Sequence, residues 1–194
     1  MIQLNAPFTE EKVRNLKLGD QVEITGIVFT GRDAVHKWLS EGNNPPVSFE
    51  NGIIYHCGPV VMPQGAGAKK GWKVTAAGPT TSIREEPYQA GVIERLKVRA
   101  VIGKGGMGEK TRLACQQFGC VYLHAIGGAA QVLAEKIVKV QNVYMLEKFG
   151  SPEAIWQLEV LSFPAVVTID AHGNSLHREI DSLSKSKFEE LLKR

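Results

Sequence analysis

Three cationic residues each follow an apolar stretch that has the composition of a β-strand. They are Arg32 after residues 21–29, Arg84 after residues 72–77 and Lys104 after residues 98–102. In open α/β sheets, ligands bind at the carboxyl ends of strands, where the first turns of helices present unpaired backbone N–H groups. Cations at three such ends can converge on one anion, and we therefore predict a binding site for a small acid.

The stretch GPTTSIR at residues 78–84 carries more hydrogen-bonding groups than a connecting turn requires. Gly78 allows the backbone to approach a ligand closely, and the proline after it holds Gly78 in an extended conformation. The hydroxyls of Thr80, Thr81 and Ser82 can donate hydrogen bonds to carboxylate oxygens. A helix N-cap would account for only one of these hydroxyls, so the remainder favour a polar ligand.

Each cation also has a plainer interpretation. Arg32 beside Asp33 could form a surface ion pair, which contributes little to stability. Arg84 precedes two glutamates and could balance their charge on a solvated face. Lys104 lies in the sequence GKGG, which lacks the Gly-x-x-x-x-Gly-Lys-Ser/Thr spacing of a Walker A loop. The repeated placement of the three cations is what favours a shared site.

Strand-like and helix-like segments alternate along the chain. The expected strands cover residues 21–29, 53–57, 72–77, 98–102, 120–124, 155–161 and 164–170, and a loop is expected at 63–71. One expected helix starts at Thr30 in a capping-box sequence that ends at Asp33; others cover 109–118, 129–138 and a short C-terminal segment. This alternation predicts an α/β fold in a single domain over residues 1–194, with antiparallel strands added at the C-terminal side.

The charge of the chain is mild and evenly spread. Its formal net charge of +3 comes from scattered lysines and arginines, so we expect no nucleic-acid partner. No stretch approaches the ~18 uninterrupted apolar residues of a membrane span, and the first residues lack the features of a secretory signal. The chain has 3 cysteines, an odd number, and we expect a reducing, cytoplasmic location.

The cysteines and histidines form no metal-binding pattern. Cys57, Cys115 and Cys120 lack the spacing of an iron–sulfur motif, and we expect them to pack in the core. The histidines are equally scattered, so we expect no metal to bind to this chain. His36 lies on the same helix face as Arg32 and could orient the arginine; a solvent-exposed or capping role is an equal alternative.

Three motifs occur in the order and spacing of one enzyme family: TGRDAVHK at 30–37, GPTTSIR at 78–84 and GKG at 103–105. Further matching stretches are LGD at 18–20, GGAA at 127–130, FPA at 163–165 and DAHGNS at 170–175. On these motifs the chain resembles the β subunit, or C-terminal domain, of class I iron–sulfur hydro-lyases, the fumarate hydratases and L-tartrate dehydratases. The resemblance covers nearly the whole chain.

The resemblance implies a swivelling β/β/α domain with a mixed sheet. It also implies a partner α subunit that carries a [4Fe-4S] cluster, an α2β2 assembly, and no cofactor bound by this chain alone. The implied reaction is the reversible hydration of a C4 dicarboxylate, which is fumarate to malate, as in the tricarboxylic acid cycle, or the dehydration of tartrate.

The resemblance also implies roles for individual residues. Carried over position by position, Arg32, Arg84 and Lys104 would bind the substrate carboxylates. Thr80 would take part in proton abstraction, with Thr81 as a weaker catalytic candidate. A threonine hydroxyl is a poor base at its ordinary acidity, so this role requires help from a carboxylate or a relay in the partner subunit.

Two positions depart from the family pattern. Glu85 stands where a methionine is common, and Gly106 stands where an asparagine is common. A glutamate pointing at a dicarboxylate would repel it, so we expect Glu85 to face away. Because the chain holds no complete catalytic set, a non-catalytic dicarboxylate-binding module is the alternative function. A purely structural scaffold would not account for the three cations.

Overall fold

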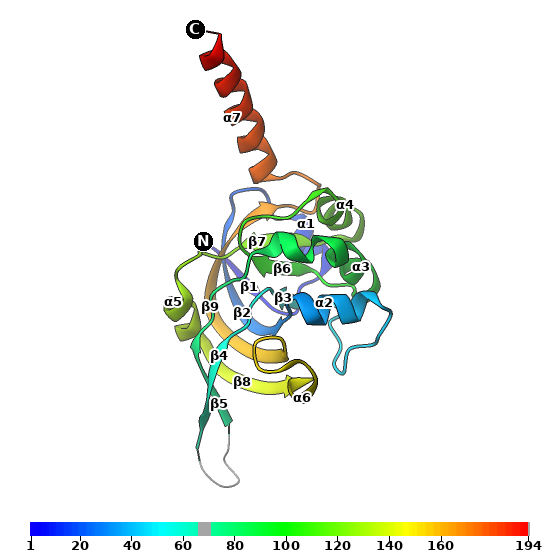
Figure 1. Cartoon of the computed structure of the whole chain (residues 1–194), viewed down its shortest axis with the longest axis vertical. Coiled ribbons are helices and arrows are strands. Elements are labelled where there is room, and N and C mark those ends of the chain that lie inside the picture. Colours follow the sequence, from blue (N-terminus) through cyan, green and yellow to red (C-terminus); the bar gives the residue numbers. More distant parts are fainter. Residues whose placement is uncertain (66–70, 194) are drawn as a thin grey trace.

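The computed structural model describes residues 1–65 and 71–193. Its main sheet has seven strands in the order β1-β2-β3-β6-β7-β9-β8 (Figure 1). They are β1 (Ile2–Asn5), β2 (Gln21–Thr30), β3 (Ile53–Tyr55), β6 (Ala100–Gly103), β7 (Val121–His124), β8 (Ile137–Tyr144) and β9 (Ile155–Ile169). The strands β1, β2, β3, β6 and β7 pair in parallel, whereas β9 pairs antiparallel with its neighbours. The predicted α/β fold with a mixed sheet is confirmed.

The long strand β9 closes the sheet on itself. It pairs with β7 at one end and with β2 along most of its length, so the strand order returns to β2. A register shift between Ile24 and Gly26 of β2 faces Ser162 of β9, which has a φ of 51°. Because the ladder continues across this bulge, the two strands predicted at 155–161 and 164–170 form one strand.

Alternate side chains of the sheet enter two separate cores. Tyr55, Ile102 and Leu123 belong to the core enclosed by the closed sheet. Their neighbours Ile54 and Val101 belong to a second core beneath helices. The helical elements are α1 (Glu10–Arg14), α2 (Asp33–Ser40), η2 (Ser82–Glu85), α3 (Glu86–Leu96), α4 (Glu109–Phe118), α5 (Ala130–Glu135), α6 (Leu146–Phe149) and α7 (Leu176–Leu192). Figure 1 shows α2, α3 and α4 side by side over one side of the sheet.

The predicted capping box at Thr30 is wrong. Thr30 is the buried last residue of β2, and its hydroxyl donates to the Ala154 carbonyl at 3.0 Å and accepts from the Trp156 N–H at 2.9 Å. The helix α2 begins three residues later than predicted. Its exposed backbone is capped instead by a distant carboxylate, since the Ala34 N–H donates to Glu153 at 3.0 Å.

Some other helix and strand boundaries differ from those predicted. The predicted helix 109–118 is confirmed as α4, but the helix predicted at 129–138 ends at Glu135, and its last residues open β8. The predicted strand 72–77 corresponds to β5 (Gly71–Ala76), which pairs with β4 (Val60–Gln64) in a separate two-stranded sheet. Of the loop expected at 63–71, residues 66–70 lie outside the described residues.

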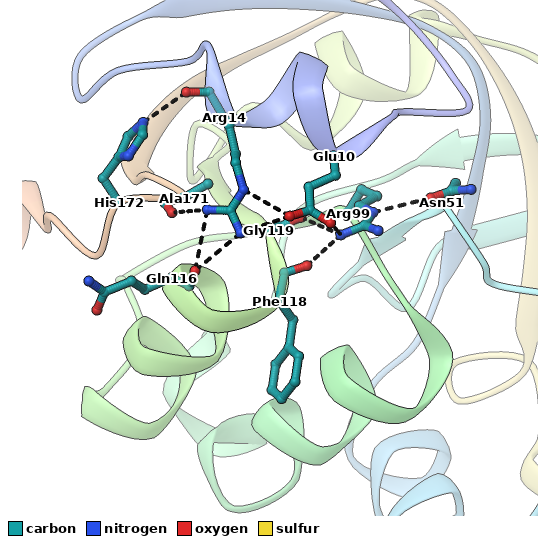
Figure 2. Close-up of polar contacts among 9 residues, drawn as sticks. All are labelled: Glu10, Arg14, Asn51, Arg99, Gln116, Phe118, Gly119, Ala171 and His172. Atoms are coloured by element: carbon teal, nitrogen blue, oxygen red, sulfur yellow. Dashed lines mark hydrogen bonds and ion pairs between the residues drawn. The ribbon is translucent and has the colours of Figure 1, made fainter.

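Two arginines tie the carboxyl end of α4 to the rest of the fold (Figure 2). Arg99 donates to the carbonyls of Phe118 and Gly119, and Arg14 donates to the carbonyls of Gln116 and Ala171. The Glu10 carboxylate lies between them, 2.8 Å from the Arg14 guanidinium and 3.2 Å from that of Arg99. Cations at this end of the helix satisfy its last carbonyls and complement its dipole.

The last helix, α7, projects away from the body of the molecule (Figure 1). Its N-cap Ser175 accepts a hydrogen bond from the Arg178 N–H, and the helix has no buried residue among those described. None of the helices in residues 1–65 and 71–193 combines the length and the apolarity needed to cross a membrane.

The amino end of α4 is fixed by Glu86, the first residue of α3. The Glu86 carboxylate accepts hydrogen bonds from the N–H groups of Gly108, Lys110 and Thr111 at 2.8 to 3.2 Å. It also accepts from the Thr111 hydroxyl at 2.7 Å. A single carboxylate therefore caps α4 from the neighbouring helix and holds the loop after β6 in place.

We predict that Glu86→Ala lowers the free energy of unfolding by about 2 kcal/mol, because it removes a charged cap and leaves N–H groups without partners. Urea denaturation measures this change. Glu94→Ala on the same helix is the matched control, and this exposed site is expected to change stability by less than about 0.5 kcal/mol. Equal effects of the two substitutions would contradict the capping role.

Candidate active site

The carboxyl ends of three parallel strands form one edge of the sheet. The strand β3 lies between β2 and β6, and each is followed by residues that the motifs singled out. Arg32 follows β2, His56 follows β3, and Lys104 follows β6. Two of the three predicted cations therefore follow the carboxyl ends of parallel strands at one edge of the sheet, on either side of β3. Ligands of α/β folds commonly bind at such strand ends.

The third cation reaches this edge by another route. Arg84 lies in η2, and the strand that precedes it belongs to the β4–β5 hairpin. The expectation that all three cations follow strands of one sheet is thus wrong for Arg84. Backbone hydrogen bonds bring its loop to the edge: the Thr80 N–H donates to the His56 carbonyl at 2.7 Å, and the Ser82 N–H donates to the Lys104 carbonyl at 3.0 Å.

Arg32 and Arg84 lie against one carboxylate, and Arg84 also contacts Thr80. Asp33 Oδ2 is 2.5 Å from Arg84 Nη2 and 3.9 Å from Arg32 Nη2. Arg84 Nη2 also donates to the Thr80 hydroxyl at 3.4 Å. Arg32 is held from its other side, with Nε 3.3 Å from Glu153. The structure therefore brings together three of the predicted site residues, two of which contact the same carboxylate.

Lys104 and Thr81 are joined to this group through the backbone. Their residues pair in a parallel bridge, which places Lys104 beside the loop that carries Thr80. In the part of the chain that the structure describes, no hydrogen bond or ion pair joins the Lys104 ammonium to another residue. The Thr81 side chain is exposed, and it does not cap η2.

Sequence reasoning missed the bridging role of Asp33. The plain interpretation paired it with Arg32, whereas its close partner is Arg84, 51 positions further along the chain. The Asp33 and Arg84 side chains are 42% and 46% exposed, so water screens their attraction and the pair adds little stability. An acidic residue directly after the motif arginine was the only sequence signal for this arrangement.

A buried chain of hydrogen bonds lies beneath the same loop. Tyr122 donates its hydroxyl to Ser82 Oγ at 2.9 Å, and Ser82 lies 2.8 Å from His56 Nδ1. His56 Nε2 lies 2.8 Å from the side-chain oxygen of Gln89. Because that amide oxygen can only accept, His56 carries its proton on Nε2 and accepts from Ser82 at Nδ1. All four side chains are buried.

This network requires the glycine at position 103. A Cβ on Gly103 would collide with the Ser82 hydroxyl and would lie 3.0 Å from the Tyr122 hydroxyl and 3.2 Å from His56 Nδ1. The glycine of the GKG motif therefore serves the buried polar network below the loop, in addition to any approach of a ligand.

The two histidines of the site are neutral. Burial lowers the pKa of His36 and lowers that of His56 well below its ordinary value. The rings meet edge to face with centroids 4.9 Å apart. His36 Nδ1 lies 3.0 Å from the Arg32 carbonyl, so the histidine positions the backbone of the arginine. The solvent-exposed alternative for His36 does not hold, since the side chain is buried.

The glutamates after Arg84 do not lie on a solvated face. Glu86 caps α4, and Glu85 is fully buried at the base of the arginine cluster. Burial raises the pKa of Glu85 to about 7, and repulsion from Asp33 contributes. Sequence reasoning expected Glu85 to face away from the ligand and gave no indication that it would be buried.

The cysteines of this chain do not fit an iron–sulfur cluster. Cys57 lies in the enclosed core, whereas Cys115 and Cys120 lie in the core beneath the helices, on the other face of the sheet. All three thiols are free and buried, as the core-packing interpretation predicted.

Comparison with known proteins identifies the family. Residues 1–180 match the family model described as "Fumarase C-terminus". The chain is 55% identical over 188 residues to a Geobacillus stearothermophilus protein named "Putative fumarate hydratase class I", a match that covers 97% of this chain and 36% of that protein. The chain thus spans about a third of the length of this relative.

Two further relatives match along most of both chains. One is "Putative L(+)-tartrate dehydratase subunit beta" of Methanocaldococcus jannaschii, 36% identical over 190 residues, with 95% of each chain covered. The other is "L(+)-tartrate dehydratase subunit beta" of Escherichia coli strain K12, 35% identical over 178 residues, with 91% of this chain and 86% of the relative covered. The resemblance predicted from the motifs is confirmed, and the chain belongs to the fumarase C-terminal family.

Proposed function

We propose that this chain is the β subunit of a [4Fe-4S] hydro-lyase that reversibly hydrates a C4 dicarboxylate, in a site completed by an α subunit. The observation that carries the proposal is that Arg32 and Arg84 both lie against the Asp33 carboxylate, while Arg84 also contacts the Thr80 hydroxyl. The names of the relatives support a partner chain, since two of them are called β subunits. An α2β2 assembly in the cytoplasm is part of this proposal.

Fumarate, which hydration converts to malate, is the first candidate substrate. The relative with 55% identity carries the name of a fumarate hydratase, and the two at 36% and 35% carry that of a tartrate dehydratase. Tartrate is accordingly the second candidate. The two reactions act on C4 dicarboxylates and require the same cationic groups.

The arginines can bind substrate carboxylates through their planar guanidinium groups. Such a group donates two parallel hydrogen bonds to one carboxylate, which fixes both distance and orientation. Asp33 shows that Arg32 and Arg84 already face one carboxylate oxygen in the free chain. We assign substrate carboxylates to these two arginines and to Lys104, the cation on the adjacent loop.

Thr80 is our candidate for proton transfer, with Thr81 as a weaker one. The Arg84 guanidinium, 3.4 Å from the Thr80 hydroxyl, favours the deprotonated form of that hydroxyl. A carboxylate or a relay from the partner would have to complete the transfer. The [4Fe-4S] cluster is assigned to the partner because the cysteines of this chain lie in separate cores.

The alternative function is a dicarboxylate-binding module without catalysis. It draws on one observation: within residues 1–65 and 71–193, neither a carboxylate nor an imidazole is hydrogen-bonded to Thr80. On this alternative the arginine cluster binds an anion, and no hydration follows in any assembly.

We predict that the purified chain alone does not hydrate fumarate, and that activity requires the reconstituted two-chain complex. The reason is that a threonine and three cations do not form a complete acid–base set. The disappearance of fumarate absorbance is the measurement. Hydration by the chain alone would contradict the proposed division of labour, and a complex inactive on fumarate and tartrate would favour the binding module.

Thr80→Val removes the hydroxyl and nearly preserves the shape of the side chain. We expect kcat of the complex to fall by roughly 100-fold or more, while KM changes little, because the loss concerns an acid–base group. Steady-state kinetics on the complex measure both constants. Thr75→Val in the hairpin is the control, with unchanged kinetics expected. Normal turnover with weaker binding would reduce Thr80 to a positioning group.

Arg84→Ala should act mainly on binding. We expect KM to rise by roughly tenfold or more, because a substrate carboxylate loses its charged hydrogen bonds. Arg84→Lys keeps the charge and loses the planar fork, so its KM should lie between those of the wild type and Arg84→Ala. A lysine variant indistinguishable from the wild type would argue against bidentate binding.

A further inference from the structure

Glu85 is a buried carboxyl group that the proposed chemistry does not use. It ends η2, directly after Arg84, and its side chain is 0% exposed. Neither carboxyl oxygen has a hydrogen-bond partner among the described residues. An ionised carboxylate without partners in such a place is costly, whereas a neutral carboxyl group is tolerated far more readily. The surroundings of Glu85 therefore favour the protonated form of its carboxyl group.

The charges that act on Glu85 come from the anion site itself. Arg32 and Asp33 act from the start of α2, where Arg32 is the N-cap and Asp33 the first helical residue, and Arg84 acts from the same turn as Glu85. The arginines favour the ionised form of Glu85, and Asp33 opposes it. The charge of an ionised Glu85 in turn helps to raise the pKa of the Tyr122 hydroxyl in β7. Glu85 and the substrate-binding arginines are thus parts of one electrostatic unit.

Among the described residues, the only charges that act on Glu85 are those of Arg32, Asp33 and Arg84. Burial keeps His36 of α2 and His56, which follows β3, neutral, and Gln89 of α3 carries no charge. Of the two acids of α3, Glu86 directs its carboxylate to the end of α4, and Glu94 is exposed. The balance of this region therefore depends on the two arginines, Asp33 and whatever anion the arginines bind.

A carboxylate that binds to the arginines makes the ionisation of Glu85 less favourable. When Glu85 is neutral, the charges of Arg32 and Arg84 are matched by Asp33 and by Glu153, which pairs with Arg32. A bound substrate carboxylate adds negative charge close to Glu85 and takes up the attraction of the arginines. Both effects disfavour the ionised form of a buried carboxyl group.

We infer that Glu85 takes up a proton from solvent when a dicarboxylate binds to Arg32 and Arg84. Glu85 is then a positioning residue of the anion site: in its neutral form it leaves the guanidinium groups free to hold the ligand. The inference rests on the proposed function, since it requires that this cluster binds a substrate carboxylate.

The linkage has a defined sign. The free chain holds Glu85 with a pKa of about 7, because burial outweighs the attraction of the arginines. Binding raises this pKa further, so proton uptake accompanies binding near and above pH 7. Affinity for a dicarboxylate should therefore fall as pH rises above 7, by up to about tenfold per pH unit. Below pH 6 Glu85 is already protonated, and the dependence disappears.

Calorimetric titration of the two-chain complex with succinate tests this inference. Succinate is a C4 dicarboxylate that cannot be hydrated or dehydrated. Titrations at pH 7.5 in two buffers with different ionisation enthalpies give the number of protons taken up. We expect up to about one proton per site for the wild type. For Glu85→Gln, which is neutral at every pH, we expect no uptake at this site and an affinity nearly constant from pH 6.5 to 8.5.

The control is Glu94→Gln, an exposed glutamate on α3, which should reproduce the wild-type titration. Uptake that persists in Glu85→Gln, or a wild type that takes up no proton, would overturn the inference. Complete absence of succinate binding would instead remove the proposed anion site, and the inference with it; that failure is seen in the affinity and not in the proton count.

Stability gives an independent measurement on the folded chain. Because the pKa of Glu85 is higher in the folded chain than the ordinary value of 4.5, ionising it costs stability as pH rises through about 7. Glu85→Gln should therefore be more stable than the wild type at pH 8, with the difference vanishing near pH 4.5. A variant less stable than the wild type at pH 8 would show that the buried carboxylate is not strained, and would contradict the inference.

Discussion

The site depends on a loop that is bound to the sheet edge through its backbone. Residues 78–84 belong to no strand of the main sheet, yet Thr80 and Ser82 donate to the carbonyls that follow β3 and β6. These two hydrogen bonds fix the loop across the ends of β3 and β6. The loop thereby places Arg84 beside Arg32, which follows the neighbouring strand β2. Side-chain attraction alone could not do this, because the ion pair between Arg84 and Asp33 is half-exposed and weak.

Buried hydrogen bonds hold the inner side of the loop, and the outer side of the loop is accessible to solvent. Ser82 turns inward to the buried chain of Tyr122, His56 and Gln89, whereas Thr80 and Arg84 of the same short segment stay accessible. Buried polar groups stabilise a structure only when their partners are in place, so such a network favours one arrangement of the loop. Thr80 and Arg84 are thereby held in fixed positions and remain accessible to a ligand.

The sequence allowed correct prediction of local features and of the family, but not of distant pairings. The helix 109–118 was predicted from the local sequence, and the proximity of Arg32, Thr80 and Arg84 from their placement and motifs. Thr30 was misread as a helix cap because its partners, Ala154 and Trp156, lie more than a hundred residues away. The burial of Glu85 likewise results from packing between segments that have no common sequence signal.

Gly103 has a consequence for how this protein can change by mutation. Any side chain at position 103 would overlap the Ser82 hydroxyl. It would also lie against the Tyr122 hydroxyl and the His56 ring. A substitution at 103 is tolerated only if Ser82 is already smaller, and loss of the Ser82 hydroxyl leaves a buried imidazole and a buried phenol without a partner. The four positions are therefore expected to covary among relatives, and single substitutions at any one of them to be rare.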